Sequence, residues 1–297
     1  MRVKELAPAK INLYLDVLAK REDGFHELET LMQTVDLADE IELVHCEWGA
    51  DEKESACGTE TTLSVIGNDE LFPSEDNLVM RAARAFLEKV NVEGKIHITL
   101  KKRIPMAAGL GGGSADAAAT LRAMNKIARK PLSECEMIDI AAKIGADVPF
   151  CLIGGRALCY GKGEILKPLE VCKKMHILIS KTEESVSTPI AYRMLDSLYA
   201  NFTLERKDDG RKAVLESLKN GDHSRLYNIF DEPVLAACPK AKRIKERMLE
   251  LGAISAIMSG SGPSVFGIFD SADSANAAKN IIDDEFDKTC TFVTQNH

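Results

Sequence analysis

The chain lacks any hydrophobic run approaching the roughly 18 consecutive apolar residues of a membrane-spanning helix. Its first residues, Met1-Arg2-Val3-Lys4-Glu5, also lack the apolar core of a secretory signal. We therefore expect a cytoplasmic protein with no membrane partner.

Metal-binding and strongly basic patterns are scarce as well. None of the eight cysteines forms a Cys-x-x-Cys pair, and the six histidines show no spacing typical of metal ligands. Lys and Arg number 38 against 46 Asp and Glu, so the formal net charge is −8. Because nucleic-acid-binding proteins are usually basic, the sequence disfavours a nucleic-acid partner. The cysteine and histidine patterns likewise disfavour a zinc site or a redox dithiol. The sequence does not indicate an oligomeric state.

The length and composition are typical of a folded protein with two domains or one large domain. The 297 residues include 45% hydrophobic and 28% charged residues, and one domain usually takes about 100–200 residues. From about residue 156 the pattern changes, and the chain ends with a helix, two strands around a Gly-rich turn, a helix and a strand. We predict an α+β fold with an N-terminal domain over 1–155, a C-terminal domain over 156–297 and a cleft between them.

Local patterns place several elements. Alternating residues predict a first strand around 11–17, and further strands are predicted at 30–36 and 41–46. Helices are predicted from Leu78, over 114–129 and over 133–144.

A glycine-rich loop at 109–113 is the first indication of function. It stands between a strand-like segment and the helix predicted to begin near Ser114. Glycines let backbone N–H groups approach a ligand, and a helix N-terminus adds aligned donors, so the pattern favours phosphate binding over a flexible loop capped by Ser114. The loop lacks the Gly-Lys-Ser/Thr of a P-loop, and the second strand of a dinucleotide-binding fold does not follow it.

Three other sequence features can each be interpreted either as ordinary structure or as part of a functional site. Lys10 and Asn12 share one face of the first strand, which can be an exposed polar face or part of a site. Asp147 follows a helix, where an aspartate is often only a turn residue. The Gly/Ser loop 259–264 fits a tight hairpin, but two glycine loops that face each other can also enclose a polyphosphate.

Three segments resemble the motifs of GHMP kinases: residues 8–13 (PAKINL), 105–115 (PMAAGLGGGSA) and 259–264 (SGSGPS). The segments GFHEL at 24–28, GADVPF at 145–150 and GGRA at 154–157 narrow the resemblance to the branch acting on a cytidine diphosphate alcohol. The resemblance implies a two-domain GHMP kinase fold with its active site in the cleft between the domains. It also implies ATP-dependent phosphorylation of the 2-hydroxyl of 4-diphosphocytidyl-2-C-methyl-D-erythritol, in non-mevalonate isoprenoid precursor biosynthesis.

The same resemblance implies roles for single residues. In that family the aspartate matching Asp147 takes the hydroxyl proton, and the lysine matching Lys10 lies beside it; a nearby cation keeps such a carboxylate ionised. ATP, with Mg²⁺ near Ser114, is expected to contact the first glycine loop and two earlier polar residues: Asn77, Lys102, Pro105, Met106, Ala107, Ala108, Gly109, Leu110, Gly111, Gly112, Gly113, Ser114 and Ala115. The cytidine substrate is expected to contact Asn12, Phe25, His26, Asp147 and Thr188.

Two positions depart from the family's pattern. Phe25 stands where the family often has tyrosine, and a phenylalanine here can also be a buried core residue; Cys151 stands where a second aromatic is common. One open alternative is another GHMP kinase, acting on mevalonate, a sugar or homoserine, against which the segments GFH and GADVPF argue. The other is a nucleotide-binding regulator without enzymatic activity, against which the presence of both Lys10 and Asp147 argues.

Overall fold

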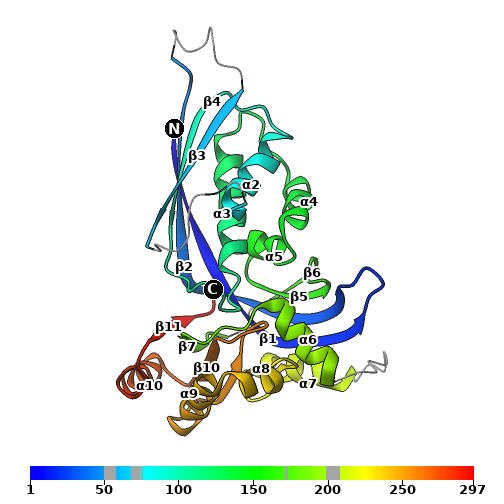
Figure 1. The fold of residues 1–297 in the computed structure, drawn as a ribbon, viewed down its shortest axis with the longest axis vertical. Helices are drawn as coiled ribbons and strands as arrows, with labels where there is room; N and C mark the ends of the chain where they lie inside the picture. The colour runs from blue at the N-terminus through cyan, green and yellow to red at the C-terminus, as the bar shows by residue number, and fades with distance from the viewer. Residues whose placement is uncertain (50–57, 68–73, 75, 171–172, 199–207) are drawn as a thin grey trace. The chain divides into compact units, whose positions relative to one another are not determined.

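The chain forms two compact units (Figure 1). The computed structural model describes residues 1–49, 58–67, 74, 76–170, 173–198 and 208–297. The first unit contains Met1–Ala9, Ala38–Ile104 and Gly111–Ile153, and the second contains Lys10–Leu37, Pro105–Leu110 and Gly154–His297. The last stretch of the second unit begins beside the expected boundary at residue 155, but this unit also takes in two segments from the N-terminal half. The division into domains 1–155 and 156–297 stays a prediction.

Two long strands, β1 (Arg2–Lys20) and β2 (His26–Cys46), contribute residues to both units. The prediction of separate strands at 30–36 and 41–46 is wrong, because β2 runs through both without a break. The stretch between them is partly acidic but contains no glycine or proline. Asp39, in its middle, is fully buried, so its charge is accommodated inside the fold instead of ending the strand.

The first unit packs helices beside a short sheet. β3 (Thr59–Ile66) pairs in parallel with β4 (Gly94–Lys101), and β4 pairs antiparallel with the end of β2. The helices are α2 (Leu78–Leu87), α3 (Gly112–Ile127), α4 (Glu134–Ile144) and α5 (Val148–Ile153). α3 contacts the other three (Figure 1), and its run of buried alanines allows this close approach.

The three helices predicted in this part of the chain are confirmed, with one shifted start. α3 begins at Gly112, two residues before the expected Ser114, and ends at Ile127. α5 escaped prediction because six residues are too few to display a helical repeat.

The second unit contains a four-stranded antiparallel sheet in the order β11-β7-β10-β9, and helices α9 and α10 pack against it. Its elements are β5 (Arg156–Gly161), β6 (Ile165–Leu169), β7 (His176–Thr182), α6 (Thr188–Leu198), α7 (Asp208–Lys219), β8 (Tyr227–Asn228), α8 (Asp231–Ala237), α9 (Pro239–Glu250), β9 (Ser255–Met258), β10 (Val265–Phe269), α10 (Ala272–Glu285) and β11 (Thr289–Gln295). The succession from α9 to β11 confirms the predicted order at the end of the chain. β5 pairs with β2, and β8 pairs with β1.

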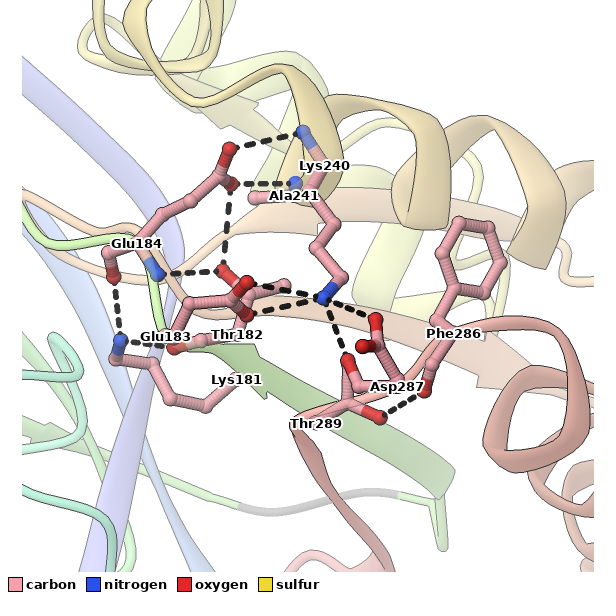
Figure 2. A network of polar contacts seen from close by, with 9 residues as sticks. All are labelled: Lys181, Thr182, Glu183, Glu184, Lys240, Ala241, Phe286, Asp287 and Thr289. Carbon is pink, nitrogen blue, oxygen red and sulfur yellow. Dashed lines mark hydrogen bonds and ion pairs between the residues drawn. The ribbon is translucent and has the colours of Figure 1, made fainter.

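A side chain from outside α9 caps that helix. The Glu184 carboxylate accepts hydrogen bonds from the backbone N–H groups of Lys240 (3.0 Å) and Ala241 (2.9 Å), as Figure 2 shows. A carboxylate is favourable at a helix N-terminus, where backbone donors are unpaired and the helix dipole is positive. This contact ties the segment after β7 to α9.

The cysteines of the described residues are all free thiols. Cys57 and Cys172 lie outside those residues. Within the same residues, no helix has both the length and the apolar character needed to cross a bilayer.

Candidate active site

The two glycine loops touch each other within the second unit. The Ser259 hydroxyl donates a hydrogen bond to the Gly109 carbonyl oxygen at 3.0 Å. Gly109 has φ +72°, and a side chain on it would overlap the Ser259 carbonyl oxygen. Gly260, at φ +57°, also has little room for a side chain, since a β-carbon there would lie 3.0 Å from the Gly109 carbonyl oxygen. The loops therefore meet backbone to backbone. Loop 259–264 also joins the antiparallel strands β9 and β10, so its interpretation as a tight hairpin is confirmed. The enclosure of a polyphosphate by the two loops stays a prediction.

Lys10 and Asn12 lie beside this junction. Both are buried, at 4% and 1% exposure, so the interpretation as an exposed polar face is wrong. The Lys10 Nζ donates to Asn12 Oδ1 at 2.8 Å, and Asn12 Nδ2 donates to Thr30 Oγ1 at 2.8 Å. A β-carbon placed on Gly260 would lie 3.3 Å from Lys10 Nζ. The ammonium group is thus held at the second glycine loop by a chain of hydrogen bonds.

Two further contacts fix the second loop. Thr188, the first residue of α6, pairs its hydroxyl with that of Ser261 at 2.9 Å. Asn228 Nδ2 donates to the carbonyl oxygens of Met258 and Gly260, both at 2.8 Å. Asn228 could not be predicted from the sequence, because no local pattern distinguishes this single asparagine from a surface residue.

Phe25 and His26 have contrasting surroundings. Phe25 is 57% exposed, so the alternative of a buried core residue is wrong; Lys162 Nζ lies 4.5 Å from its ring centroid. The His26 side chain is 8% exposed, and its Nε2 lies 2.7 Å from Asp196 Oδ1. Its ring stacks on Tyr192 with centroids 4.6 Å apart. The Phe25 ring is therefore accessible, and the neighbouring imidazole is held in place.

In the first unit, the second half of the glycine loop opens α3. Gly111 is the N-cap residue at φ +68°, and no side chain of the described residues caps the helix. The interpretation of Ser114 as the cap is therefore wrong; it lies, half-buried, in the first turn. An uncapped helix N-terminus leaves backbone N–H donors and a partial positive charge for an anion.

A buried ionic cluster lies behind this turn. Lys102 is 5% exposed, and its Nζ donates to Asp39 and, at 2.8 Å, to Asp116 on α3. Asp39 also accepts hydrogen bonds from the backbone N–H groups of Arg103 and Ile104. One cation thus faces two buried carboxylates. Burial raises the pKa of Asp116 to about 7, against the opposing effect of Lys102.

The carboxylates shift the pKa of Lys102 in the opposite sense to burial. Burial would lower the pKa of this lysine, but Asp116 and Asp39 outweigh burial and raise it. Lys102 therefore stays charged, and its ammonium group is already engaged by protein carboxylates. The Oδ1 of Asn77 is also engaged, since it caps α2 by accepting from the Val79 N–H at 3.0 Å.

Asp147 lies half-buried between α4 and α5, where its carbonyl oxygen accepts a hydrogen bond from the Cys151 N–H at 3.0 Å. It belongs to the first unit, together with the ATP-loop residues from Gly111 onward. Lys10 and the loop residues from Pro105 to Leu110 belong to the second unit. Of these, Met106 and Ala107 are exposed and Ala108 and Leu110 are buried. The pairing of Lys10 with Asp147 stays a prediction.

The described residues contain no group of three or more His, Cys, Asp and Glu side chains able to hold a metal ion. Mg²⁺ that binds with a nucleotide is commonly held by one or two protein oxygens plus substrate phosphates. Ser114 offers one such oxygen at the uncapped helix end.

Comparisons with known families agree with these features. The family of GHMP kinases N-terminal domains matches residues 77–155, and that of GHMP kinases C-terminal domains matches residues 212–288. The first match includes the glycine loop, α3 and Asp147; the second includes both strands around loop 259–264.

Curated relatives resemble the chain over almost its whole length. A protein of Alkaliphilus metalliredigens named 4-diphosphocytidyl-2-C-methyl-D-erythritol kinase is 40% identical over 91% of this chain and 89% of its own. A protein of Thermoanaerobacter pseudethanolicus with the same name is 41% identical over 91% of this chain and 88% of its own.

Solved structures give the same grouping. A crystal structure of 4-(cytidine 5'-diphospho)-2C-methyl-D-erythritol kinase aligns with a TM-score of 0.79 and 33% identity, covering 99% of this chain and 100% of that one. A homoserine kinase from Cytophaga hutchinsonii aligns with a TM-score of 0.76 at 23% identity, covering 100% of this chain and 94% of that one, a likeness of fold alone. The chain therefore belongs to the GHMP kinases, in the family of the 4-diphosphocytidyl-2-C-methyl-D-erythritol kinases.

Proposed function

We propose that the chain transfers the γ-phosphoryl group of ATP to the 2-hydroxyl of 4-diphosphocytidyl-2-C-methyl-D-erythritol, a step in non-mevalonate isoprenoid precursor synthesis. The observation that carries this proposal is the junction of the two glycine loops with the Lys10 ammonium group beside it. Glycines let the backbone approach a ligand closely, and the Lys10 ammonium group adds a positive charge beside them, which suits a polyphosphate. The relatives that share nine-tenths of the chain bear the name of this kinase.

Asp147 is proposed to accept the proton of the attacking hydroxyl, with Lys10 as the neighbouring cation. Phosphoryl transfer needs little covalent chemistry, so positioning and charge stabilisation provide most of the catalysis. The Lys10–Asn12–Thr30 hydrogen bonds support this role, because they hold the ammonium group in one place. A fixed cation stabilises an ionised base and the negative charge on the transferring group.

The nucleotide is proposed to lie along the first glycine loop with its phosphates at the N-terminus of α3. The uncapped first turn supports this assignment. Bound Mg²⁺ would neutralise phosphate charge, with Ser114 as its protein oxygen. Of the two polar residues assigned to ATP, Lys102 would act through its backbone and the elements it holds, since its ammonium group already has protein partners. Asn77 uses its Oδ1 to cap α2, so its Nδ2 is the side-chain group proposed to contact the nucleotide.

The cytidine end of the substrate is proposed to contact Phe25 and His26. The exposed Phe25 ring suits stacking on a base, and the fixed His26 imidazole suits hydrogen bonding to its polar edge. Asn12 and Thr188, beside the two loops, are proposed to contact the rest of the substrate.

Consumption of ATP against a panel of alcohols tests the proposal. The panel contains 4-diphosphocytidyl-2-C-methyl-D-erythritol, mevalonate, homoserine and galactose, each with Mg²⁺. We expect rapid phosphorylation of the diphosphocytidyl alcohol alone, with the phosphate located at its 2-hydroxyl by NMR. Preferential turnover of another alcohol would assign the chain to another GHMP activity. ATP binding without turnover of any alcohol would favour the regulator.

A further inference from the structure

A single carboxylate on α6 holds the His26 ring. Asp196 Oδ1 lies 2.7 Å from His26 Nε2, and Asp196 Oδ2 accepts from Lys20 Nζ at 2.6 Å. Burial would raise the pKa of Asp196, but the hydrogen bonds from Lys20 and His26 outweigh burial and lower it. Tyr192, one turn earlier on α6, stacks against the ring with an interplanar angle of 27°. Two side chains of one helix therefore fix the position and the plane of the imidazole.

This arrangement determines which ring nitrogen carries the proton. An ionised carboxylate only accepts hydrogen bonds, so His26 Nε2 must be the N–H donor. In the neutral ring, Nδ1 is then the unprotonated acceptor. Nδ1 makes no hydrogen bond with any described residue, although the side chain is only 8% exposed. Among the described residues, the chain thus presents one acceptor nitrogen without a partner at the residue that follows the exposed Phe25.

We infer that Asp196 is a positioning residue for base selectivity, which holds His26 as the Nε2–H tautomer so that Nδ1 accepts a hydrogen bond from the exocyclic amino group of cytosine. This inference rests on the proposed function, which places the base beside Phe25 and His26. Cytosine has an amino donor at position 4, whereas uracil has a carbonyl oxygen there. An acceptor nitrogen therefore pairs with cytosine and faces a second acceptor in uracil. A site that hydrogen-bonds a substrate group strongly rejects the analogue lacking it.

The tautomer is measured without substrate, by ¹⁵N NMR of the histidine side chains in the full-length protein. The His26 signals are assigned by their absence in His26→Gln. We expect the Nε2–H tautomer in the wild type at about pH 8 and a mixture of tautomers in Asp196→Ala. A wild-type ring protonated on Nδ1 would overturn the inference whether or not the chain has the proposed activity.

Selectivity is measured as the ratio of kcat/KM for the cytidine substrate to kcat/KM for its uridine counterpart. In Asp196→Ala we expect the KM for the cytidine substrate to rise about tenfold and the ratio to fall at least about tenfold, as for a lost hydrogen bond to a buried partner. The KM for ATP and the melting temperature should stay near wild-type values. The ratio in Asp196→Asn should lie between those of the wild type and Asp196→Ala, because an amide oxygen can still accept a hydrogen bond from the Nε2–H of His26.

The matched control is Lys20→Met, which removes the other partner of Asp196 and leaves His26 untouched. It should keep the wild-type ratio. An unchanged ratio in Asp196→Ala, or an equal loss in Lys20→Met, would overturn the inference. A wild-type protein that does not phosphorylate the cytidine substrate would instead overturn the proposed function and the selectivity claim with it, while the NMR result would still report on Asp196.

Discussion

The Asp147 carboxylate is the residue on which the proposed chemistry depends most directly. We expect Asp147→Asn to lower kcat by about 10²–10⁴ with little change in ATP affinity, because the amide has nearly the same shape but cannot accept the proton. Turnover and nucleotide titration on one preparation measure both quantities. Asp139→Asn is the matched control, since Asp139 is an exposed aspartate on α4 in the same unit. Near-normal turnover in Asp147→Asn would remove this residue from the mechanism.

Asp116 gives a prediction about the pH dependence of stability. Its folded-state pKa is raised above the ordinary aspartate value, so between the two values the folded protein binds more protons than the unfolded chain. The stabilisation that accompanies this uptake is present at low pH and is lost as pH rises toward about 7. Asp116→Asn leaves Lys102 paired with Asp39 alone. We therefore compare the melting temperature of Asp116→Asn with that of the wild type at two pH values. We expect the difference, variant minus wild type, to be more positive at about pH 8 than at about pH 5.

Thermal unfolding at these two pH values, with Asp139→Asn measured alongside, tests this expectation. For the exposed control Asp139→Asn, the difference in melting temperature from the wild type should be almost the same at both pH values. A pH-independent difference for Asp116→Asn would mean that the carboxylate titrates normally. Lys102→Met should be strongly destabilising at about pH 8, since it removes the cation that faces both buried carboxyl groups.

At the scale of elements, the junction of the glycine loops can be tested with two glycines of the same conformation. Gly109 and Gly155 both have φ +72°, but a β-carbon at Gly109 would overlap the Ser259 carbonyl oxygen, whereas one at Gly155 would meet nothing within 4 Å. Gly155→Ala should cost only the strain of a left-handed residue, about 1–2 kcal/mol. Gly109→Ala should lose more stability and raise the KM for ATP at least about tenfold, because the loops must separate.

Chemical denaturation and ATP kinetics on both variants check this comparison. Circular dichroism first establishes that each variant is folded. Equal effects of the two substitutions would mean that backbone strain alone, and not contact between the loops, makes glycine necessary at position 109.

The capping of α9 gives a second prediction at this scale. Cys238, the N-cap residue, makes no side-chain cap bond, and the Glu184 carboxylate supplies the missing acceptors (Figure 2). We expect Glu184→Ala to lower the free energy of unfolding by about 1–2 kcal/mol, as for loss of a helix cap. Glu183→Ala, at the preceding position, removes a carboxylate that is 51% exposed and that bonds to Lys240 Nζ alone among the described side chains, so its effect should be small. Urea denaturation measures the free energy of unfolding of both variants. Equal losses of stability in Glu184→Ala and Glu183→Ala would contradict the capping role of Glu184.

At the scale of the whole molecule, we expect the predicted domains not to fold separately. β5 pairs with Leu28–Gln33 of β2, and β8 pairs with β1. Leu15, Val17 and Leu28 are buried in the same core cluster as α8 and α9 residues. A fragment of residues 156–297 loses these partners and should expose apolar surface. Poor dispersion in its NMR spectrum and rapid proteolysis would support this; a stable, well-dispersed fragment would contradict it.

Many features of this protein could be predicted from the sequence because their signals are local. The glycine loop and the helix after it lie within about 20 consecutive residues, and turn and helix preferences act over that range. The shared face of Lys10 and Asn12 follows from the two-residue repeat of a strand. The continuity of β2 through its acidic middle could not be predicted, because it depends on the groups that meet the buried Asp39 carboxylate.

The sequence by itself determined the α+β class, the glycine loops and the kinase motifs, since each is encoded in short runs with characteristic residue types. Only the tertiary structure decided which distant residues meet. Asp39 reaches Lys102 from 63 positions away, and Gly109 meets Ser259 from 150 positions away. Asp196 reaches His26 across 170 positions. Such contacts depend on strand register and helix packing, which arise from the burial of many side chains together, so no local pattern carries them.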